Sequence, residues 1–293
     1  MSATSEMIWQ CGPQRLDLSA ISQVMGILNT TPDSFSDGGR YAKLEKAVVR
    51  GMEIEREGAA ILDVGGESTR PGAEDLTEKE ELKRVLPVIE NLASVLKIPI
   101  SIDTSKPEVA RQALDAGATI INDVSGLRDP VMMDLCAERK CGIVLMHMRG
   151  TPRTMMKLAG YADLIGELRK FFQDSLSKVK EAGIDPRRIC FDPGIGFAKS
   201  EEDNIEILRH LPELVIGSRP LLIGLSRKSF IGALTGIENP AKRDPATVAL
   251  TAQIAMSFPA IHRTHQIKEN VQAIRLVEEV VKQHPNSCSR NTQ

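Results

Sequence analysis

Polar side chains that can bind ligands follow eight short apolar segments of this sequence. These side chains are Asn29, Asp63, Asp103, Asn122, His147, Asp192, Lys228 and Arg263. Any Asp or Asn among them could instead cap a helix, because such side chains accept hydrogen bonds from free backbone N–H groups. Their recurrence after every segment favours a shared site. Carboxylates such as Asp103 and Asp192 need partners to stay charged when buried, and a ligand rich in N–H donors could provide them.

Basic side chains gather after the last two apolar segments. Lys228, Arg263 and His265 lie there, and Arg70 lies in a loop after the second segment. Together they predict an anion site. Asn29 offers a neutral oxygen that would suit a Mg²⁺ ion, which keeps most of its waters and otherwise binds phosphate oxygens. A pyrophosphate with Mg²⁺ is the simplest ligand that uses all of these groups.

The apolar segments themselves are short and rich in β-branched and aliphatic residues, as strands are. They span residues 24–28, 61–64, 98–102, 119–121, 143–146, 189–191 and 221–223, with a weaker one near Ile261. Helical periodicity separates most of them, at residues 78–96, 107–116, 163–182, 203–211, 245–256 and 268–283. This alternation predicts a parallel sheet, and eight such units predict an α/β fold of the (β/α)₈ TIM-barrel type.

A doubly wound open sheet is the competing architecture, because it also consists of repeated βα units. No GxGxxG motif follows the first strand, which favours the barrel. In a barrel the carboxyl ends of all strands meet on one face, so the polar residues above would lie together. Glycines at the predicted helix ends support the chain direction, namely Gly58, Gly117, Gly142 and Gly183.

We expect a single domain over residues 1–293, with the barrel at about 20–283. Residues 1–19 are expected to form a hairpin at the barrel floor, and residues 285–293 a disordered polar tail. The loops at 30–41 and 65–77 are long and rich in Gly, Ser and Pro, so they could close over a substrate or be ordinary surface loops. An apolar stripe on the last helix, with Val271, Ile274 and Val277, could pack on the barrel or on a second subunit.

The composition of the chain excludes several classes of protein. With 293 residues, 42% hydrophobic and 26% charged, it can bury a large core. A net charge of −2 argues against nucleic acid as a partner. No apolar run is long enough to span a bilayer, so no membrane role is expected. The 5 cysteines lack metal-binding spacing and are read as reduced thiols of a cytoplasmic protein.

Six motifs, in order, resemble those of the dihydropteroate synthase family of pterin-binding TIM barrels. They are GILNTTPDSFSDGG at 26–39, DVGGESTRPG at 63–72, SIDTS at 101–105, INDVSG at 121–126, DPGIGF at 192–197 and SRKSF at 226–230. The resemblance runs from about Gly26 to Glu279 and implies a barrel that is usually a homodimer. It implies an enzyme of folate biosynthesis that joins hydroxymethyl-dihydropterin pyrophosphate to p-aminobenzoate and releases pyrophosphate. Sulfonamides mimic p-aminobenzoate in this family.

The resemblance also implies roles for individual residues. Asp103, Asn122, Asp192 and Lys228 would hold the pterin. Asn29, Thr69, Arg263 and His265 would hold the pyrophosphate, with Mg²⁺ on Asn29. The residues implied near p-aminobenzoate are Asp33, Ser34, Phe35, Ser68, Arg70, Pro71, Phe197, Ser226 and Lys228. The expected catalytic residues among all of these are Asp103, Lys228, Arg263 and His265.

The sequence departs from the family pattern in two places. Gln266 stands where the family usually has Asp, and Ser257-Phe258-Pro259 stands where a Gly usually leads into the last strand. The last strand is therefore the least well defined in the sequence. His147, after the fifth strand, could be a packed, hydrogen-bonded imidazole, and we leave it out of the predicted site.

Two other functions remain open at this stage. A pterin-binding methyltransferase barrel would share the pterin positions, but it has no use for a pyrophosphate site. A non-catalytic pterin-binding paralogue would keep the pocket without turnover, and Gln266 is its only support. Affinity for pyrophosphate with Mg²⁺ distinguishes the first, and product formation distinguishes the second.

Overall fold

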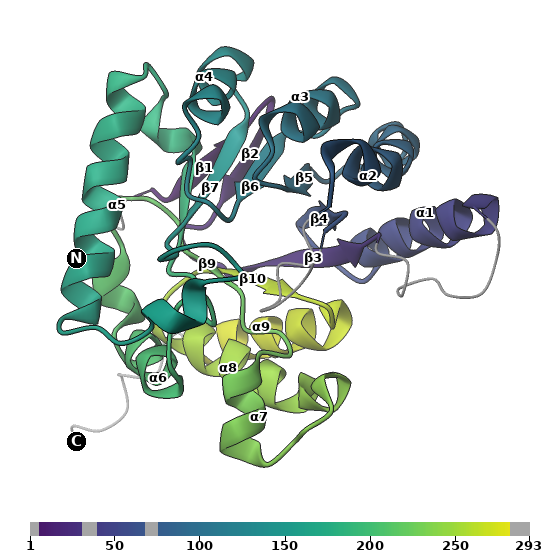
Figure 1. The fold of residues 1–293 in the computed structure, drawn as a ribbon. Helices are drawn as coiled ribbons and strands as arrows, with labels where there is room; N and C mark the ends of the chain where they lie inside the picture. Colours follow the sequence, from purple (N-terminus) through teal and green to yellow (C-terminus); the bar gives the residue numbers. More distant parts are fainter. Residues whose placement is uncertain (1–5, 31–39, 68–75, 282–293) are drawn as a thin grey trace, which may run out of the picture.

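Eight parallel strands form a nearly closed barrel surrounded by helices (Figure 1). The computed structural model describes residues 6–30, 40–67 and 76–281. The barrel strands are β3 (Gln23–Asn29), β4 (Ile61–Gly65), β5 (Ile100–Asp103), β6 (Ile120–Asp123), β7 (Gly142–Met146), β8 (Ile189–Asp192), β9 (Leu222–Ile223) and β10 (Ile261–Thr264). The eight predicted strands are confirmed, the weak one near Ile261 included.

The order of the strands distinguishes the barrel from an open sheet. From β3 to β8 each strand pairs in parallel with the next, and β10 pairs with both β9 and β3. The remaining seam, between β8 and β9, is joined by a bridge of Phe191 to Leu221, where Phe191 N–H donates to the Pro220 carbonyl at 2.9 Å. The sheet therefore returns on itself, and the open-sheet alternative is excluded.

Helices cover the outside of the barrel, one or two after each strand (Figure 1). They are α1 (Arg40–Arg56), α2 (Glu78–Ala93), α3 (Pro107–Asp115), α4 (Pro130–Arg139), α5 (Leu164–Glu181), α6 (Glu201–Arg209), α7 (Ser229–Thr235), α8 (Asp244–Ser257) and α9 (Ile267–Val281). The six predicted helices are all present. Local chemistry defines their starts: Thr77 and Glu80 form a capping box at α2, and Pro107 opens α3.

The inside of the barrel is layered. At the amino ends of the strands, inward side chains form an apolar floor layer with three residues that precede the first barrel strand: Trp9, Cys11, Leu18, Met25, Ile61, Ile120, Val144, Cys190, Leu222 and Ile261. Successive side chains of a strand alternate between its two faces. Two residues beyond Ile61, Ile120, Cys190 and Ile261, the inward positions are therefore Asp63, Asn122, Asp192 and Arg263. The apolar floor layer thus supports a polar layer at the carboxyl ends.

The predicted amino-terminal hairpin is confirmed and lies against this floor layer. Strands β1 (Ile8–Cys11) and β2 (Gln14–Asp17) pair antiparallel. Trp9 is fully buried, and its indole N–H donates to the carbonyl of Arg188 at 2.8 Å. The hairpin therefore closes the end of the barrel away from the polar layer.

One predicted helix end is wrong. Gly58, Gly117 and Gly183 all have positive φ after their helices, as expected, but Gly142 lies inside β7 with no positive φ. The left-handed residue after α4 is Lys140, with φ 51°. Gly142 is needed for another reason, because a Cβ there would lie 3.2 Å from the Cα of Cys11 in the hairpin.

No helix in the described ranges is both long and apolar enough to cross a membrane.

Candidate active site

A guanidinium joins two carboxylates at the carboxyl end of the barrel. Arg263 on β10 donates from Nε to Asp63 Oδ2 at 2.7 Å, and one terminal nitrogen lies 2.6 Å from both Asp63 Oδ2 and Asp103 Oδ2. Asn122 on β6 donates to Asp63 at 3.3 Å. These side chains come from four strands, so only the closed barrel brings them together.

The environment of this cluster sets its charge state. Burial raises the pKa of Asp103 to about 7, although the Arg263 charge opposes the rise. Burial also works against the charge of Arg263, but Asp63 and Asp103 outweigh it and hold the pKa of the guanidinium above its usual value. Asp103 Oδ1 is buried and has no hydrogen-bond partner among the described residues. It is thus an acceptor available to a ligand N–H.

A second group lies around Asp192 on β8. Its Oδ1 accepts the backbone N–H of Gly194 at 2.7 Å. Burial raises the pKa of Asp192, while the Gly194 N–H and the charge of Lys228 oppose that rise. Lys228 Nζ lies 4.0 Å from the ring centroid of Phe197, a cation–π distance. A Cβ at Gly196 would lie 3.0 Å from Lys228 Cδ, and Gly196 has φ 78°, a backbone conformation that favours glycine.

A third group surrounds His265, just after β10. Ser226 Oγ lies 2.9 Å from His265 Nδ1 and also accepts the His265 backbone N–H at 3.2 Å. Asn29 Nδ2 lies 3.4 Å from His265 Nε2. Ser226 and Asn29 therefore fix the orientation of the imidazole. Ser226, predicted beside p-aminobenzoate, is engaged with His265 in this structure.

The surroundings of Asn29 fit the predicted Mg²⁺ ligand. Its Nδ2 faces His265, and no described residue hydrogen-bonds to its Oδ1. A Cβ placed on Gly65 would lie 3.8 Å from that Oδ1 and 3.7 Å from Asp103 Oδ2, so the space beside Gly65 borders both groups. Within the described ranges, no three His, Cys, Asp or Glu side chains are arranged to hold a metal. A cation at Asn29 would therefore take most of its ligands from water and phosphate oxygens, as Mg²⁺ prefers.

The structure brings most of the predicted site residues to one end of the barrel. These are Asn29, Asp103, Asn122, Asp192, Phe197, Ser226, Lys228, Arg263 and His265. The implied loop residues Asp33, Ser34, Phe35, Ser68, Thr69, Arg70 and Pro71 lie outside the described residues. Arg263, which was predicted as a pyrophosphate ligand, pairs in the structure with Asp63 and with Asp103, a residue predicted to hold the pterin.

Three residues of this end were missing from the predicted site. Asp63 is among the polar side chains at the predicted strand ends but was assigned no role, although it is the next inward residue after Ile61 on the same strand. Lys199 is buried under the Asp192–Ala198 loop, and no sequence pattern marks it. His147, which was left aside, is buried, and its Nδ1 lies 3.2 Å from Lys199 Nζ.

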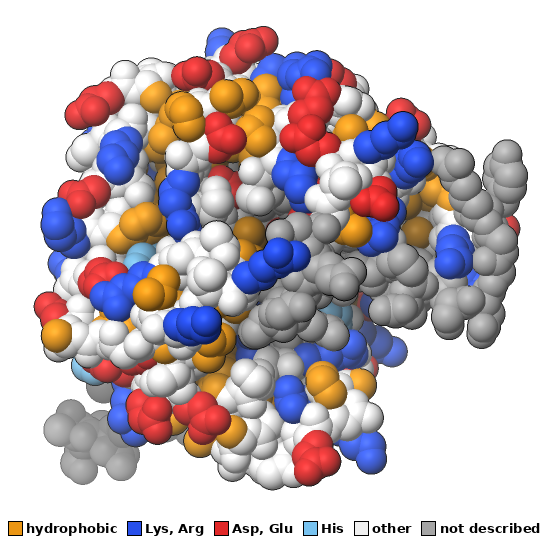
Figure 2. Space-filling model, viewed as in Figure 1, with side chains coloured by type: hydrophobic (Ala, Val, Ile, Leu, Met, Phe, Trp, Pro, Cys, Tyr) orange, Lys and Arg blue, Asp and Glu red, His pale blue; other side chains and the backbone are white. Residues whose placement is uncertain are grey.

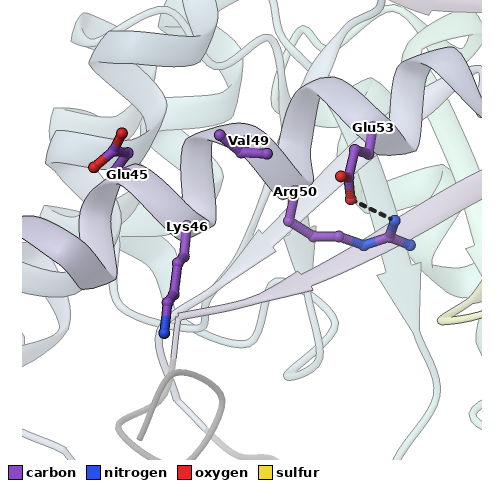
Figure 3. A pocket seen from close by; sticks show the side chains of 5 residues that line it. All are labelled: Glu45, Lys46, Val49, Arg50 and Glu53. Atoms are coloured by element: carbon purple, nitrogen blue, oxygen red, sulfur yellow. Dashed lines mark hydrogen bonds and ion pairs between the residues drawn. The ribbon is translucent and has the colours of Figure 1, made fainter. Parts of the chain in front are cut away.

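Basic and acidic side chains are interspersed over the face shown in Figure 2. A shallow hollow beside α1 is lined by Glu45, Lys46, Val49, Arg50 and Glu53 (Figure 3). Arg50 pairs there with Glu53 at 3.2 Å, and the lining contains no predicted site residue.

Comparisons with known proteins agree with this geometry. The family model described as pterin binding enzyme matches residues 25–265. A dihydropteroate synthase of Synechocystis is 46% identical over 268 residues, which cover 91% of this chain and 93% of the relative. The dihydropteroate synthase of Xanthomonas albilineans with 4-aminobenzoic acid superimposes with a TM-score of 0.88 at 43% identity, covering 94% of this chain and 98% of that one.

A further structure of the Xanthomonas albilineans enzyme, in complex with 7,8-dihydropteroate, has a TM-score of 0.84 and 41% identity. It covers 93% of this chain and 98% of that one. Sequence, fold and the arrangement of the strand ends thus agree, and the chain belongs to the pterin-binding enzymes, within the dihydropteroate synthase family.

Proposed function

We propose that this protein condenses 6-hydroxymethyl-7,8-dihydropterin pyrophosphate with p-aminobenzoate to give 7,8-dihydropteroate and pyrophosphate. The observation that carries the proposal is the convergence around one barrel mouth of Asp103 on β5, Asp192 on β8 and Lys228 in the segment between β9 and α7. The two carboxylates suit the ring N–H and amino groups of a pterin, and the ammonium suits its acceptor atoms. The relatives named above, one with 4-aminobenzoic acid and one with dihydropteroate, support the same reaction.

The pterin would be held by several groups with defined tasks. Asp103 Oδ1, which has no described partner, would accept from a ring N–H. Asn122 donates to Asp63 through its nitrogen, so its carbonyl oxygen remains for the ligand. Arg263 is fixed by its two carboxylates and would present a planar guanidinium to the ring.

Bond breaking would occur between the pterin methylene and the pyrophosphate. The leaving oxygen takes the bonding electron pair, the methylene becomes cationic, and the neutral amine of p-aminobenzoate then forms the C–N bond and loses a proton. His265 and Asn29 lie where they could bind the departing pyrophosphate. A Mg²⁺ ion bound at Asn29 would stabilise the negative charge that develops on it. No covalent enzyme intermediate is required.

Release of pyrophosphate by the purified protein tests this proposal. The substrate pterin pyrophosphate is supplied with or without p-aminobenzoate, and with Mg²⁺ or excess EDTA. We expect release to require the amine for sustained turnover and to fall at least ~10-fold without the metal, because an unneutralised leaving group raises the barrier. Release that is indifferent to both additions would contradict the proposal.

The alternative functions predict different results in the same experiment. A non-catalytic pterin-binding paralogue would bind the pterin pyrophosphate tightly and form no product. A pterin-binding methyltransferase would show little gain in affinity from pyrophosphate and Mg²⁺. Both differ from the expected synthase, which binds the pyrophosphate form and turns it over.

We also propose that the protein is a homodimer through α8 and α9, which pack side by side (Figure 1). Of the predicted stripe, Val271 and Ile274 are buried against the barrel, whereas Val277 is only partly buried. Leu276 and Val280 remain 67% and 73% exposed, and Met256 on α8 is 60% exposed. Light scattering should give twice the mass of the chain, and Leu276→Glu with Val280→Glu should give the mass of one chain. A monomeric wild-type protein would refute this.

The proposed setting is the cytoplasm. Cys11, Cys136, Cys141 and Cys190 are buried as free thiols. Free thiols of this kind are typical of a reducing compartment.

A further inference from the structure

A buried lysine lies beneath the loop that carries Asp192 and Phe197. Lys199 is 2% exposed, and its Nζ donates to the carbonyls of Phe197 at 3.0 Å and His147 at 3.4 Å. Among the described residues, no carboxylate lies within ion-pair distance of it. A buried ammonium without a counter-ion is costly, and burial lowers the pKa of Lys199 to about 7. Proteins retain such a costly buried group mainly where it has a functional role.

The loop above Lys199 has an unusual backbone. Gly194, Gly196 and Ala198 all have positive φ, at 68°, 78° and 53°. For alanine this conformation costs about 1 kcal/mol, so surrounding contacts must hold it. Tyr161 donates its hydroxyl to the Ala198 carbonyl at 3.0 Å, and Asn204 accepts the Gly196 N–H at 2.7 Å.

Lys199 connects this loop to the end of β7. Burial and the Lys199 charge lower the pKa of His147 to about 3, so the imidazole is neutral. Its Nδ1 can then accept from Lys199, and its Nε2–H points to Glu167, 3.4 Å away. Arg149 in turn binds Glu167. Contacts therefore run from the buried Lys199 through His147 and Glu167 to Arg149, which is partly exposed.

This loop carries Phe197, which the family resemblance implies lies beside p-aminobenzoate. Phe197 lies against Lys228 and packs with Met146, Met148 and Met155. Beside this apolar packing, Lys199 adds a polar link, because its Nζ contacts both the Phe197 carbonyl and His147, the residue that follows β7. Without it, the ring could move while the Asp103 group, on other strands, stayed in place.

We propose that Lys199 is a positioning residue for the amine substrate: it ties Phe197 to the end of β7 and so fixes the wall against which p-aminobenzoate binds. This inference rests on the proposed synthase function. It goes beyond that function by assigning a task to a residue that touches neither substrate.

Steady-state kinetics test the proposal through the two substrates separately. Lys199→Met keeps most of the side-chain volume and removes the donor. We expect the KM for p-aminobenzoate to rise at least ~10-fold, as for loss of a charged hydrogen bond, and the Kd of the pterin pyrophosphate to change less than ~3-fold. Lys199→Arg, which keeps a donor, should recover most of the loss. Lys170→Met, at an exposed lysine, is the matched control.

Amide hydrogen exchange tests the same anchor without turnover. The N–H groups of Gly194, Gly196 and Phe197 are hydrogen-bonded in the loop and should exchange slowly. Lys199→Met should speed their exchange at least ~10-fold and leave the hairpin at residues 8–17 unchanged. Tyr161→Phe removes the hydrogen bond to the Ala198 carbonyl and should also speed exchange of these loop N–H groups. The test can therefore be made with this variant if the Lys199 variant folds poorly.

The outcomes separate the two ideas. Unchanged loop exchange in Lys199→Met, or equal losses for both substrates, overturns the role of Lys199 and leaves the synthase function standing. A wild-type protein that forms no dihydropteroate overturns the function, while the exchange measurement still decides whether Lys199 anchors the loop.

Discussion

Arg263 determines how several carboxylates can share the mouth of the barrel. Its guanidinium contacts Asp63 and Asp103 through the same terminal nitrogen. Two buried carboxylates without this cation would repel each other and favour protonation. Because Arg263 uses only Oδ2 of Asp103, the other oxygen remains an acceptor. One residue therefore both balances the charge and leaves the ligand site open.

The raised pKa of Asp103 predicts a pH dependence for catalysis. A carboxyl with a pKa of about 7 is ionised above that pH and neutral below it. If the ionised form accepts the pterin N–H, kcat/KM should fall up to tenfold per unit as pH drops below ~7. Asp103→Asn should lower the plateau by at least ~10²-fold and lose this limb. If Asp103→Asn kept the same fall in kcat/KM below pH ~7, the titrating group would be a residue other than Asp103.

Lys228 should be equally important, for a different reason. Its ammonium lies beside Phe197 and near Asp192, where it can reach both proposed substrates. We expect Lys228→Ala to reduce kcat/KM at least ~10²-fold, on the scale of a charged hydrogen bond in a desolvated site. Lys170→Ala on the surface should leave it unchanged. Near-normal kinetics for Lys228→Ala would refute the site assignment.

At the residue scale the sequence predicted which side chains meet, but not how they pair. Polar residues after each strand were predictable because barrel topology brings strand ends together. The pairing of Arg263 with Asp63 was not, since it depends on rotamers and on the tilt of β10. Lys199 could not be found, because a lysine after Phe197-Ala198 is ordinarily read as solvated.

At the scale of elements, the end of α4 shows where a local rule failed. The pattern predicted a glycine in the left-handed position, and Lys140 occupies it with its side chain exposed. Gly142 is instead required by the close approach of the hairpin. Tertiary packing, which no local pattern contains, explains the difference.

Lys140 provides a stability prediction. Lys140→Gly should raise the free energy of unfolding by about 0.5 kcal/mol, because glycine adopts positive φ without strain and this gain exceeds its extra unfolded-state entropy. Lys140→Ala removes the same side chain but keeps the strain, so it should give no gain. Urea denaturation measures the free energy of unfolding of both variants. A Lys140→Gly variant that is less stable than Lys140→Ala would contradict this prediction.

The last strand shows the reverse case, in which a weak signal was correct. Ser257-Phe258-Pro259 replaces the usual glycine, yet β10 forms at Ile261–Thr264. Phe258 is extended, with φ −167°, and packs partly against the core. Pairing with both β3 and β9 holds β10 in place, so neighbouring strands supply what the local sequence lacks.

At the scale of the whole molecule, the two ends of the barrel have different tasks. The hairpin and the apolar floor layer close one end, and the polar layer opens at the other. Repetition of strand and helix made the barrel itself predictable. The packing of the hairpin against the apolar floor layer could not be predicted in detail, because it depends on how the Trp9 side chain fits among the floor residues.

Trp9 should therefore matter for stability and not for chemistry. Trp9→Ala removes a fully buried ring and should reduce the free energy of unfolding by about 3–5 kcal/mol. Trp9→Phe, which loses the hydrogen bond to Arg188 and part of the buried ring, should cost less than Trp9→Ala, about 1–3 kcal/mol. Val131→Ala, at an exposed residue, should change it by less than ~0.5 kcal/mol. A small effect of Trp9→Ala would show that the hairpin is dispensable.

The most direct test of the central claim is identification of the product by mass. The purified protein is incubated with hydroxymethyl-dihydropterin pyrophosphate, Mg²⁺ and ¹⁵N-labelled p-aminobenzoate, and pyrophosphate is measured in parallel. The proposed reaction predicts dihydropteroate that carries the label, formed in equal amount to the pyrophosphate released. Tight binding of the pterin with no labelled product, or pyrophosphate released without a new C–N bond, would contradict it.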